Sequence, residues 1–242
     1  MTVEELTKSQ KKLHEEIQQF AEKINNGLEP IYDGVGNIDT YLHSPLKIMW
    51  LLKESYDQDK KGNRGTGNWS IYEAVQNDTA WSYLSFQRMA YVLYGYNNHI
   101  YCEGKDMPKI RNHREMVKDL ANIAYININK LPGGTTSDDS HIARCYKEWK
   151  NIIGKQIEVY NPDVIILGGT EKFLDFKNEF VQCEHYENTG VNPKLDSKIY
   201  KWGNRWIISV YHPGYMMSTE VYVDLIIDSL KYVNEQIKSH RK

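Results

Sequence analysis

The sequence has few cysteines, no long apolar run and no marked excess of charge of one sign. Its 242 residues include only three cysteines, which lie about forty residues apart and form no CxxC pair. This argues against a disulfide framework, a zinc ribbon or an iron–sulfur cluster. We also expect no other metal and no cofactor. No apolar signal segment opens the sequence, and no apolar run approaches the length of a membrane span. We therefore expect a cytoplasmic protein that does not contact membranes.

The charge of the chain gives no general attraction to nucleic acid. The net charge is −2 and the pI is about 6.5, so contacts with phosphates must depend on local patches. One basic stretch stands out, with Lys105, Lys109, Arg111, His113, Arg114 and Lys118. We name Lys109 and Arg111 as candidates for contacts with DNA phosphates. A solvated protein surface is the more common role of such a charge run.

Apolar runs alternate with helical spacing along the chain, which predicts an α/β fold. The runs predict strands, at residues 47–52, 122–126, 164–167 and 206–211. Helical spacing predicts amphipathic helices, among them 3–28, 81–94 and 220–238. The alternation is typical of a three-layer α/β/α sandwich with a mostly parallel central sheet. We expect a single domain over 1–242, in which the helix 3–28 packs on a core formed by 47–238.

Four smaller features complete this prediction. Residues 31–46 are expected to form a loop, and the polar segment 183–198 to be irregular. Thr170 is suited to cap a helix that bears Phe173, Phe176 and Phe180. Residues 200–202 and 206–208 are expected to form a hairpin across a three-residue connection, 203–205.

Polar side chains follow the ends of three predicted strands. Glu54 and Asp57 follow the first strand, Asn127 follows the second, and His212 follows the last. In open α/β sheets, ligands bind just beyond the carboxyl ends of the strands. A carboxylate there can activate water, an imidazole can donate a proton, and an amide can bind the edge of a base. Each residue also has an ordinary role in caps and turns, so the hypothesis is that they meet in one cleft.

Five short motifs occur in an order that resembles the uracil-DNA glycosylase superfamily across most of residues 47–238. They are Lys53-Glu-Ser-Tyr-Asp57, Gly67-Asn-Trp-Ser-Ile-Tyr72, Ile126-Asn-Ile-Asn129, Pro162-Asp-Val-Ile-Ile-Leu-Gly168 and Tyr211-His-Pro-Gly214. Two motifs differ from the superfamily's pattern. The first usually opens with glycine, where this chain has Lys53, and the last usually continues with serine or alanine, where this chain has Gly214.

The resemblance implies a uracil-DNA glycosylase-like fold and an enzyme that acts on DNA, either in DNA repair or in defence against modified foreign DNA. We expect a monomer. Such an enzyme flips uracil or another modified base out of single- or double-stranded DNA and hydrolyses its N-glycosidic bond. It implies that Glu54, or Asp57 in its place, positions water and that His212 donates to the departing base. It implies a base pocket formed by Asn127, Trp69, Tyr72, Ser55 and Tyr56. It implies a loop that enters the DNA, formed by Pro213, Gly214, Tyr215 and Met216.

Two other interpretations stay open. A catalytically inactive protein on the same fold would bind nucleobases, nucleotides or DNA in a sensor or regulatory role, which suits the altered first motif and the negative net charge. A generic flavodoxin-like domain would instead place Glu54, Asn127 and His212 far apart.

Overall fold

A central seven-stranded sheet organises the fold of the computed structural model, which describes residues 1–24, 27–58, 61–174, 183–186 and 197–240. The strand order is β2-β5-β3-β6-β9-β8-β7. The bounds are β2 Gly34–Val35, β3 Ile48–Leu52, β5 Ala124–Asn127, β6 Val164–Gly168, β7 Cys183–Tyr186, β8 Lys198–Trp202 and β9 Arg205–Val210. The four inner strands β5, β3, β6 and β9 are parallel, and the outer strands are antiparallel to their neighbours. The predicted mostly parallel sheet is confirmed.

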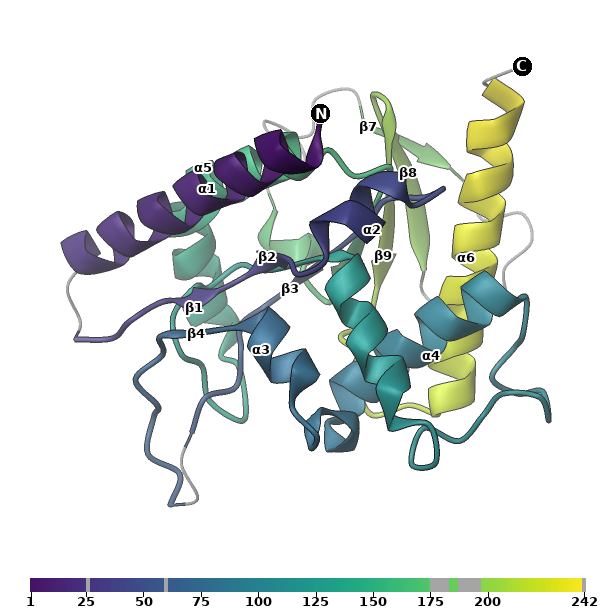
Figure 1. The fold of residues 1–242 in the computed structure, drawn as a ribbon, viewed down its shortest axis with the longest axis horizontal. Coiled ribbons are helices and arrows are strands. Elements are labelled where there is room, and N and C mark those ends of the chain that lie inside the picture. Colours follow the sequence, from purple (N-terminus) through teal and green to yellow (C-terminus); the bar gives the residue numbers. More distant parts are fainter. Residues whose placement is uncertain (25–26, 59–60, 175–182, 187–196, 241–242) are drawn as a thin grey trace.

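Helices cover both faces of this sheet. On one face lie α1 and α5, side by side, and on the other lie α4 and α6, which pack against each other (Figure 1). The helix bounds are α1 Val3–Ile24, α2 Ile38–His43, α3 Ile71–Gln76, α4 Leu84–Asn98, α5 Asp139–Tyr160 and α6 Thr219–His240. Short 3₁₀ helices add η1 Ala80–Ser82, η2 Arg114–Asn122 and η3 Glu171–Phe173.

Alternating side chains of the inner strands supply both halves of the core. Trp50 of β3 joins the cluster under α4 and α6, whereas its neighbours Met49 and Leu51 join the cluster under α1 and α5. Every residue of β3, β5 and β6 is buried. This explains why these strands are continuous apolar runs in the sequence, since strands covered on both faces have no solvent side.

Three local predictions are wrong. Residues 31–46 are not one loop, because they contain β1 Ile31–Tyr32, β2 and α2, whose first turn is capped by Asn37 through a 3.1 Å hydrogen bond from the N–H of Thr40. β1 pairs in parallel with β4 Trp69–Ser70 in a small second sheet. Within the segment expected to be irregular, residues 183–186 form β7, because they pair with β8.

Thr170 is the third correction. It makes no side-chain cap, and its Oγ1 donates instead to the carbonyl oxygen of Leu51 at 3.1 Å, inside the core. The predicted helix after it begins only as the 3₁₀ turn η3, and Phe176 and Phe180 lie outside the described residues. The predicted hairpin is confirmed, but its connection has two residues, because Arg205 pairs with Trp202. None of the described helices has the combined length and apolar character of a membrane span.

Candidate active site

The parallel strands end at one common edge of the sheet, and the predicted site residues follow these ends. Leu52 of β3 is level with Asn127 of β5, Glu54 comes two residues after β3, and His212 comes two residues after β9. β5 and β9 are three strand spacings apart, which corresponds to about 14 Å between their backbones. In Figure 1 this edge lies toward the bottom, near the beginnings of α4 and α6.

Asn127 has a buried side chain with one unused hydrogen-bonding atom. The residue is 2% exposed, and its Nδ2 donates to Oγ of Ser55 at 2.8 Å. Its Oδ1 is buried and has no hydrogen-bond partner among the residues that the structure describes. A buried carbonyl oxygen without a donor is costly, and few occur in folded proteins. This oxygen is therefore suited to accept an N–H from a ligand.

The backbone of Asn127 is fixed by a ring of buried polar side chains. Oδ2 of Asp33 accepts from the N–H of Asn127 and from Nζ of Lys130, both at 2.7 Å. Gln156 closes the ring, because its Oε1 accepts from Lys130 and its Nε2 donates to Asp33, again at 2.7 Å. Burial lowers the pKa of Lys130, and the Asp33 carboxylate opposes that shift. The ring holds the end of β5 in place.

His212 presents one ring nitrogen to the protein and leaves the other without a partner. Nδ1 accepts from the N–H of Gly214 at 3.0 Å, so a neutral imidazole carries its proton on Nε2. Nε2 makes no hydrogen bond to any described residue. The end of β6 approaches His212 closely, and a Cβ at Gly169, where φ is +70°, would come within 3.2 Å of the His212 Cβ. Glycine is therefore favoured at this position.

His212 is neutral at physiological pH. Burial, with a smaller contribution from the positive charge of Lys53, lowers the pKa of His212 to about 4. Lys53 comes directly after β3, and its Nζ donates to Asp139 at 3.1 Å. The predicted imidazole therefore has a lysine as its charged neighbour, and no carboxylate contributes to its pKa.

Glu54 lies at the same edge, but its carboxylate contacts a different set of side chains. Oε2 accepts from Nδ2 of Asn129 at 3.1 Å and lies 3.9 Å from Nε2 of His141 on α5. The Glu54 side chain is only 5% exposed. Next to these residues is a hollow of about 230 Å³, lined by Ile24, Arg64, Asn129, Leu131, His141, Arg144, Cys145 and Glu148. The Glu54 carboxylate thus lies on the side of the sheet edge that faces α5, where it contacts Asn129 and His141.

Asp57 organises the loop that carries the predicted stacking residue. Its Oδ2 accepts from the N–H of Gly67 at 3.0 Å and from Nε1 of Trp69 at 3.1 Å. Trp69 packs against the core cluster under α4 and α6. Asp57 therefore holds this loop in place. Trp69 lies near the sheet edge because it pairs with Ile31, and the N–H of Ile31 donates to the carbonyl oxygen of Lys130.

Of the other residues predicted for the base pocket, Ser55 contacts Asn127, whereas Tyr72 does not lie at the strand ends. Ser55 is buried and contacts Asn127, as described above. Tyr56 is 45% exposed and pairs with Gly133. Tyr72 packs against Gly36, near the beginning of β5, so the structure does not bring it to the strand ends.

The loop after His212 is exposed at its tip. Met216 is 95% exposed and Tyr215 is 50% exposed, whereas Pro213 is buried. The rings of Tyr211 and Tyr215 stack at 4.5 Å between centroids. The N–H of Tyr215 donates to the carbonyl of His212 at 2.8 Å, so the turn through Gly214 has a defined conformation.

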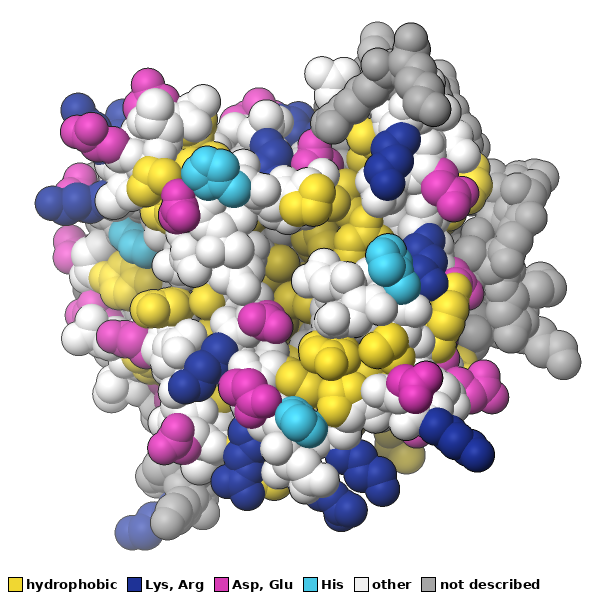
Figure 2. Space-filling model, turned by 45° about the vertical axis from the view of Figure 1, so that its right-hand side comes forward, with side chains coloured by type: hydrophobic (Ala, Val, Ile, Leu, Met, Phe, Trp, Pro, Cys, Tyr) yellow, Lys and Arg dark blue, Asp and Glu magenta, His cyan; other side chains and the backbone are white. Residues whose placement is uncertain are grey.

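The predicted phosphate contacts lie on the loop between α4 and η2. Lys109 and Arg111 are exposed, and the intervening Ile110 is anchored by its N–H, which donates to Oη of Tyr91 at 2.8 Å. Figure 2 shows one face of the molecule, on which Lys and Arg side chains gather along the lower edge and acidic ones lie among the apolar ones. Phosphate binding by Lys109 and Arg111 stays a prediction.

Sequence reasoning missed two residues at this edge. Phe86 of α4 meets Tyr125, the residue two positions before Asn127, with 6.2 Å between ring centroids. Arg88 is 3% exposed and binds the loop after His212. An arginine within the apolar helix 81–94 was the available signal, but its partners are more than one hundred residues away.

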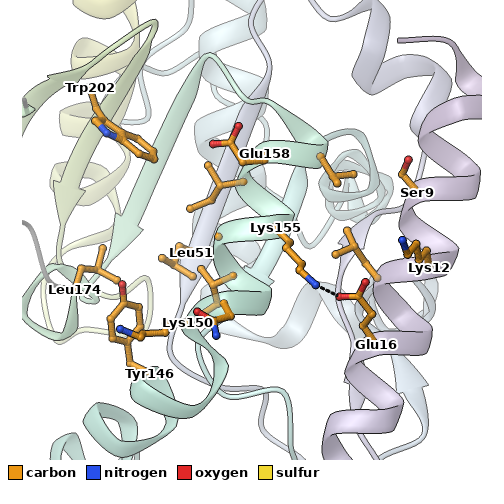
Figure 3. Close-up of a pocket in the computed structure, with 16 residues that line it drawn as sticks. Ser9, Lys12, Glu16, Leu51, Tyr146, Lys150, Lys155, Glu158, Leu174 and Trp202 are labelled. Carbon is orange, nitrogen blue, oxygen red and sulfur yellow. Dashed lines mark hydrogen bonds and ion pairs between the residues drawn. The ribbon is translucent and has the colours of Figure 1, made fainter. Parts of the chain in front are cut away.

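A larger hollow lies away from the strand ends. It has a volume of about 1000 Å³ and lies between α1, α5 and β8, with a Lys155–Glu16 ion pair of 2.6 Å at its rim (Figure 3). None of the predicted site residues lines it. Its mixed charges and apolar lining indicate no particular chemistry.

Among the described residues, no group of three or more His, Cys, Asp and Glu side chains is arranged to hold a metal ion. A comparison with protein-family models and with curated proteins finds no match for this chain.

Proposed function

We propose that this chain is a DNA glycosylase that hydrolyses the N-glycosidic bond of uracil or another modified base. The observation that carries the proposal is the buried, unpartnered Oδ1 of Asn127 at the end of a central strand. An imide or amide edge of a base has an N–H that would satisfy this oxygen. The base would be flipped out of the stack, and Trp69, which lies near the same edge, would stack on it.

His212 would act on the departing base. Cleavage of the N-glycosidic bond leaves an oxocarbenium-like sugar and negative charge on the base. A neutral imidazole with its proton on Nε2 can donate to the carbonyl oxygen where that charge gathers, and such a donor contributes about 3–4 kcal/mol in comparable sites. The positive charge of Lys53 would also stabilise the negative charge on the departing base.

Glu54 would hold the water that attacks the sugar. Its carboxylate accepts from Asn129, which leaves lone pairs for one water molecule. The same carboxylate would offset the positive charge that develops on the sugar. Asp57 is the weaker candidate, since its Oδ2 already accepts two hydrogen bonds.

The test is a base-release assay. Oligonucleotides that contain uracil, hypoxanthine or other modified bases, single- and double-stranded, are incubated with the protein, and abasic sites are then cleaved with alkali. We expect strand cleavage for at least one substrate, and a rate at least ~10²-fold lower for His212→Ala. The matched control is His43→Ala, an exposed histidine of α2 that is 76% accessible. Absence of cleavage across the whole panel would contradict the proposal.

A second candidate is a protein that binds nucleobases or DNA without cleaving them. It is favoured by the position of the Glu54 carboxylate, which contacts Asn129 and His141 and does not influence the pKa of His212. Binding of base-modified DNA that depends on Asn127, without any base release, would select this candidate.

A further inference from the structure

One buried arginine binds three backbone carbonyls of the loop that follows His212. Nη1 of Arg88 donates to the carbonyl oxygens of Pro213 at 2.8 Å and Tyr215 at 2.7 Å. Nη2 donates to the carbonyl of Met217, and Nε lies 3.3 Å from Oγ1 of Thr219. A single guanidinium therefore bridges residues 213–219.

Burial lowers the pKa of the Arg88 guanidinium, and the charges of Tyr222 and Glu220 oppose that shift. No carboxylate oxygen of a described residue forms an ion pair with it, and its guanidinium carbon lies 5.3 Å from the ring centre of Tyr222. The direct acceptors of its donors are instead three backbone carbonyls and the Thr219 hydroxyl. A buried charge is costly, and a methionine of similar volume would fill the same space between α4 and α6. Packing alone therefore does not explain an arginine at this position, and the hydrogen bonds of its guanidinium must be considered.

The carbonyls that Arg88 binds surround the contact that fixes the ring of His212. Gly214, whose N–H donates to Nδ1 of His212, lies between Pro213 and Tyr215. If this turn opens, Nδ1 loses its donor and both tautomers of the neutral imidazole become populated. The ring also gains access to water.

We propose that Arg88 is the positioning residue of His212, which holds the 213–219 loop so that Nδ1 stays bound to Gly214 and Nε2–H points away from the protein. The consequence for catalysis rests on the proposed glycosylase function, whereas the positioning itself does not. Lysine cannot replace Arg88, because one ammonium cannot reach three carbonyls that are arranged for a planar fork.

The first experiment measures His212 directly. The ring nitrogens of His212 are followed by NMR in the wild type, Arg88→Lys, Arg88→Ala and the control Arg205→Lys, an arginine on the opposite edge of the sheet whose side chain is 17% exposed. We expect a pure Nε2–H tautomer with a pKa near 4 in the wild type and in the control. In folded Arg88 variants we expect mixed tautomers and a pKa that moves toward 6.5, because the ring regains water and only the Lys53 charge still opposes protonation. Unchanged His212 signals in a folded Arg88 variant would overturn the proposal.

A second measurement needs no substitution. In the wild type, the amide proton of Gly214 should exchange slowly with solvent and show a coupling to Nδ1 of His212 across the hydrogen bond. Fast exchange of this proton would overturn the proposal even if both Arg88 variants fail to fold.

Activity then separates this proposal from the proposed function. With a cleaved substrate, Arg88→Lys should lower kcat about 10²-fold, as expected when a catalytic group is displaced by about 1 Å, with a smaller change in KM. If no substrate is cleaved but the His212 signals change as expected, positioning by Arg88 stands and the glycosylase function fails. If kcat falls while the His212 signals stay unchanged, positioning by Arg88 is refuted.

Discussion

The two sides of the carboxyl end of β3 differ in how their polar groups are satisfied. On the side of α5, the Glu54 carboxylate accepts from Asn129 at 3.1 Å and lies 3.9 Å from Nε2 of His141. On the side of α4 and α6, Oδ1 of Asn127 and Nε2 of His212 have no partner among the described residues. Unpaired polar groups at a sheet edge are those that a ligand can satisfy. The buried oxygen of Asn127 and the free ring nitrogen of His212 therefore lie on the second side, whereas on the first side Oε2 of Glu54 already accepts from Asn129.

The largest expected effect tests whether Glu54, on the side of α5, takes part in base release. Glu54→Gln keeps an oxygen that can accept from Asn129 but removes the charge. If Glu54 activates water, base release should fall at least ~10²-fold while stability changes little. The control is Glu158→Gln, at the far end of α5. An unchanged rate would assign all chemistry to the side of His212.

The next effect is a change of about 3 kcal/mol in the free energy of unfolding at low pH, caused by the titration of His212. The pKa of His212 is about 4 in the fold and about 6.5 in the unfolded chain. Between these values the unfolded chain takes up a proton that the folded protein does not, so stability is full above pH 6.5 and is lost as the pH falls toward 4. Urea unfolding should therefore show that the stability advantage of the wild type over His212→Gln shrinks by up to about 3 kcal/mol. Parallel pH profiles would show that His212 is not desolvated.

The next smaller effect is a loss of about 2 kcal/mol in the free energy of unfolding when Asp57 is replaced by alanine. It tests whether Asp57 has a structural role, in contrast to the catalytic role proposed for Glu54. Asp57→Ala leaves the Gly67 N–H and Trp69 Nε1 without their acceptor, and hydrogen bonds to a charged group contribute about 1.5–3 kcal/mol. Asp57→Asn should lose less, since an amide oxygen still accepts. Urea unfolding followed by tryptophan fluorescence measures both, with the exposed Asp78→Ala as the control. Equal stability of Asp57→Ala and wild type would show that the loop does not depend on this carboxylate.

The smallest effect on stability is expected at Asn127. Asn127→Ala removes the hydrogen bond to Ser55 but also removes an unpartnered oxygen, so the free energy of unfolding should change by less than about 1 kcal/mol. Affinity for DNA with a modified base should fall at least about tenfold, as when one well-formed hydrogen bond is lost. Calorimetry and a binding titration test the two parts, with the exposed Asn98→Ala as the control. A large loss of stability with unchanged affinity would make Asn127 a purely structural residue.

Local sequence patterns predicted the parallel core well. Runs such as 164–167 are apolar at every position because both faces are covered, and a strand that ends in His212 or Asn127 must bring that residue to the sheet edge. The same patterns could not determine which way a side chain turns after the strand has ended. This is why Glu54 was expected beside His212, although its carboxylate binds on the side of α5.

Long-range polar partners were beyond the reach of sequence patterns. Lys130 belongs to a segment that looks like a polar loop, yet it is 0% exposed because Asp33 and Gln156 satisfy its ammonium. Arg88 is hidden in the same way by carbonyls of the loop after His212. Thr170 followed the rule for helix caps, but a buried carbonyl of β3 competes for its hydroxyl.

The ring of Asp33, Lys130 and Gln156 has a consequence for how this chain can diverge. Replacing Lys130 alone would leave an uncompensated carboxylate in the core, and replacing Asp33 alone would leave a bare ammonium, changes that cost about 3–5 kcal/mol. A concerted exchange for apolar residues avoids that cost. Descendants of this sequence should therefore retain all three residues or lose them together, as a correlated set spread over more than one hundred positions.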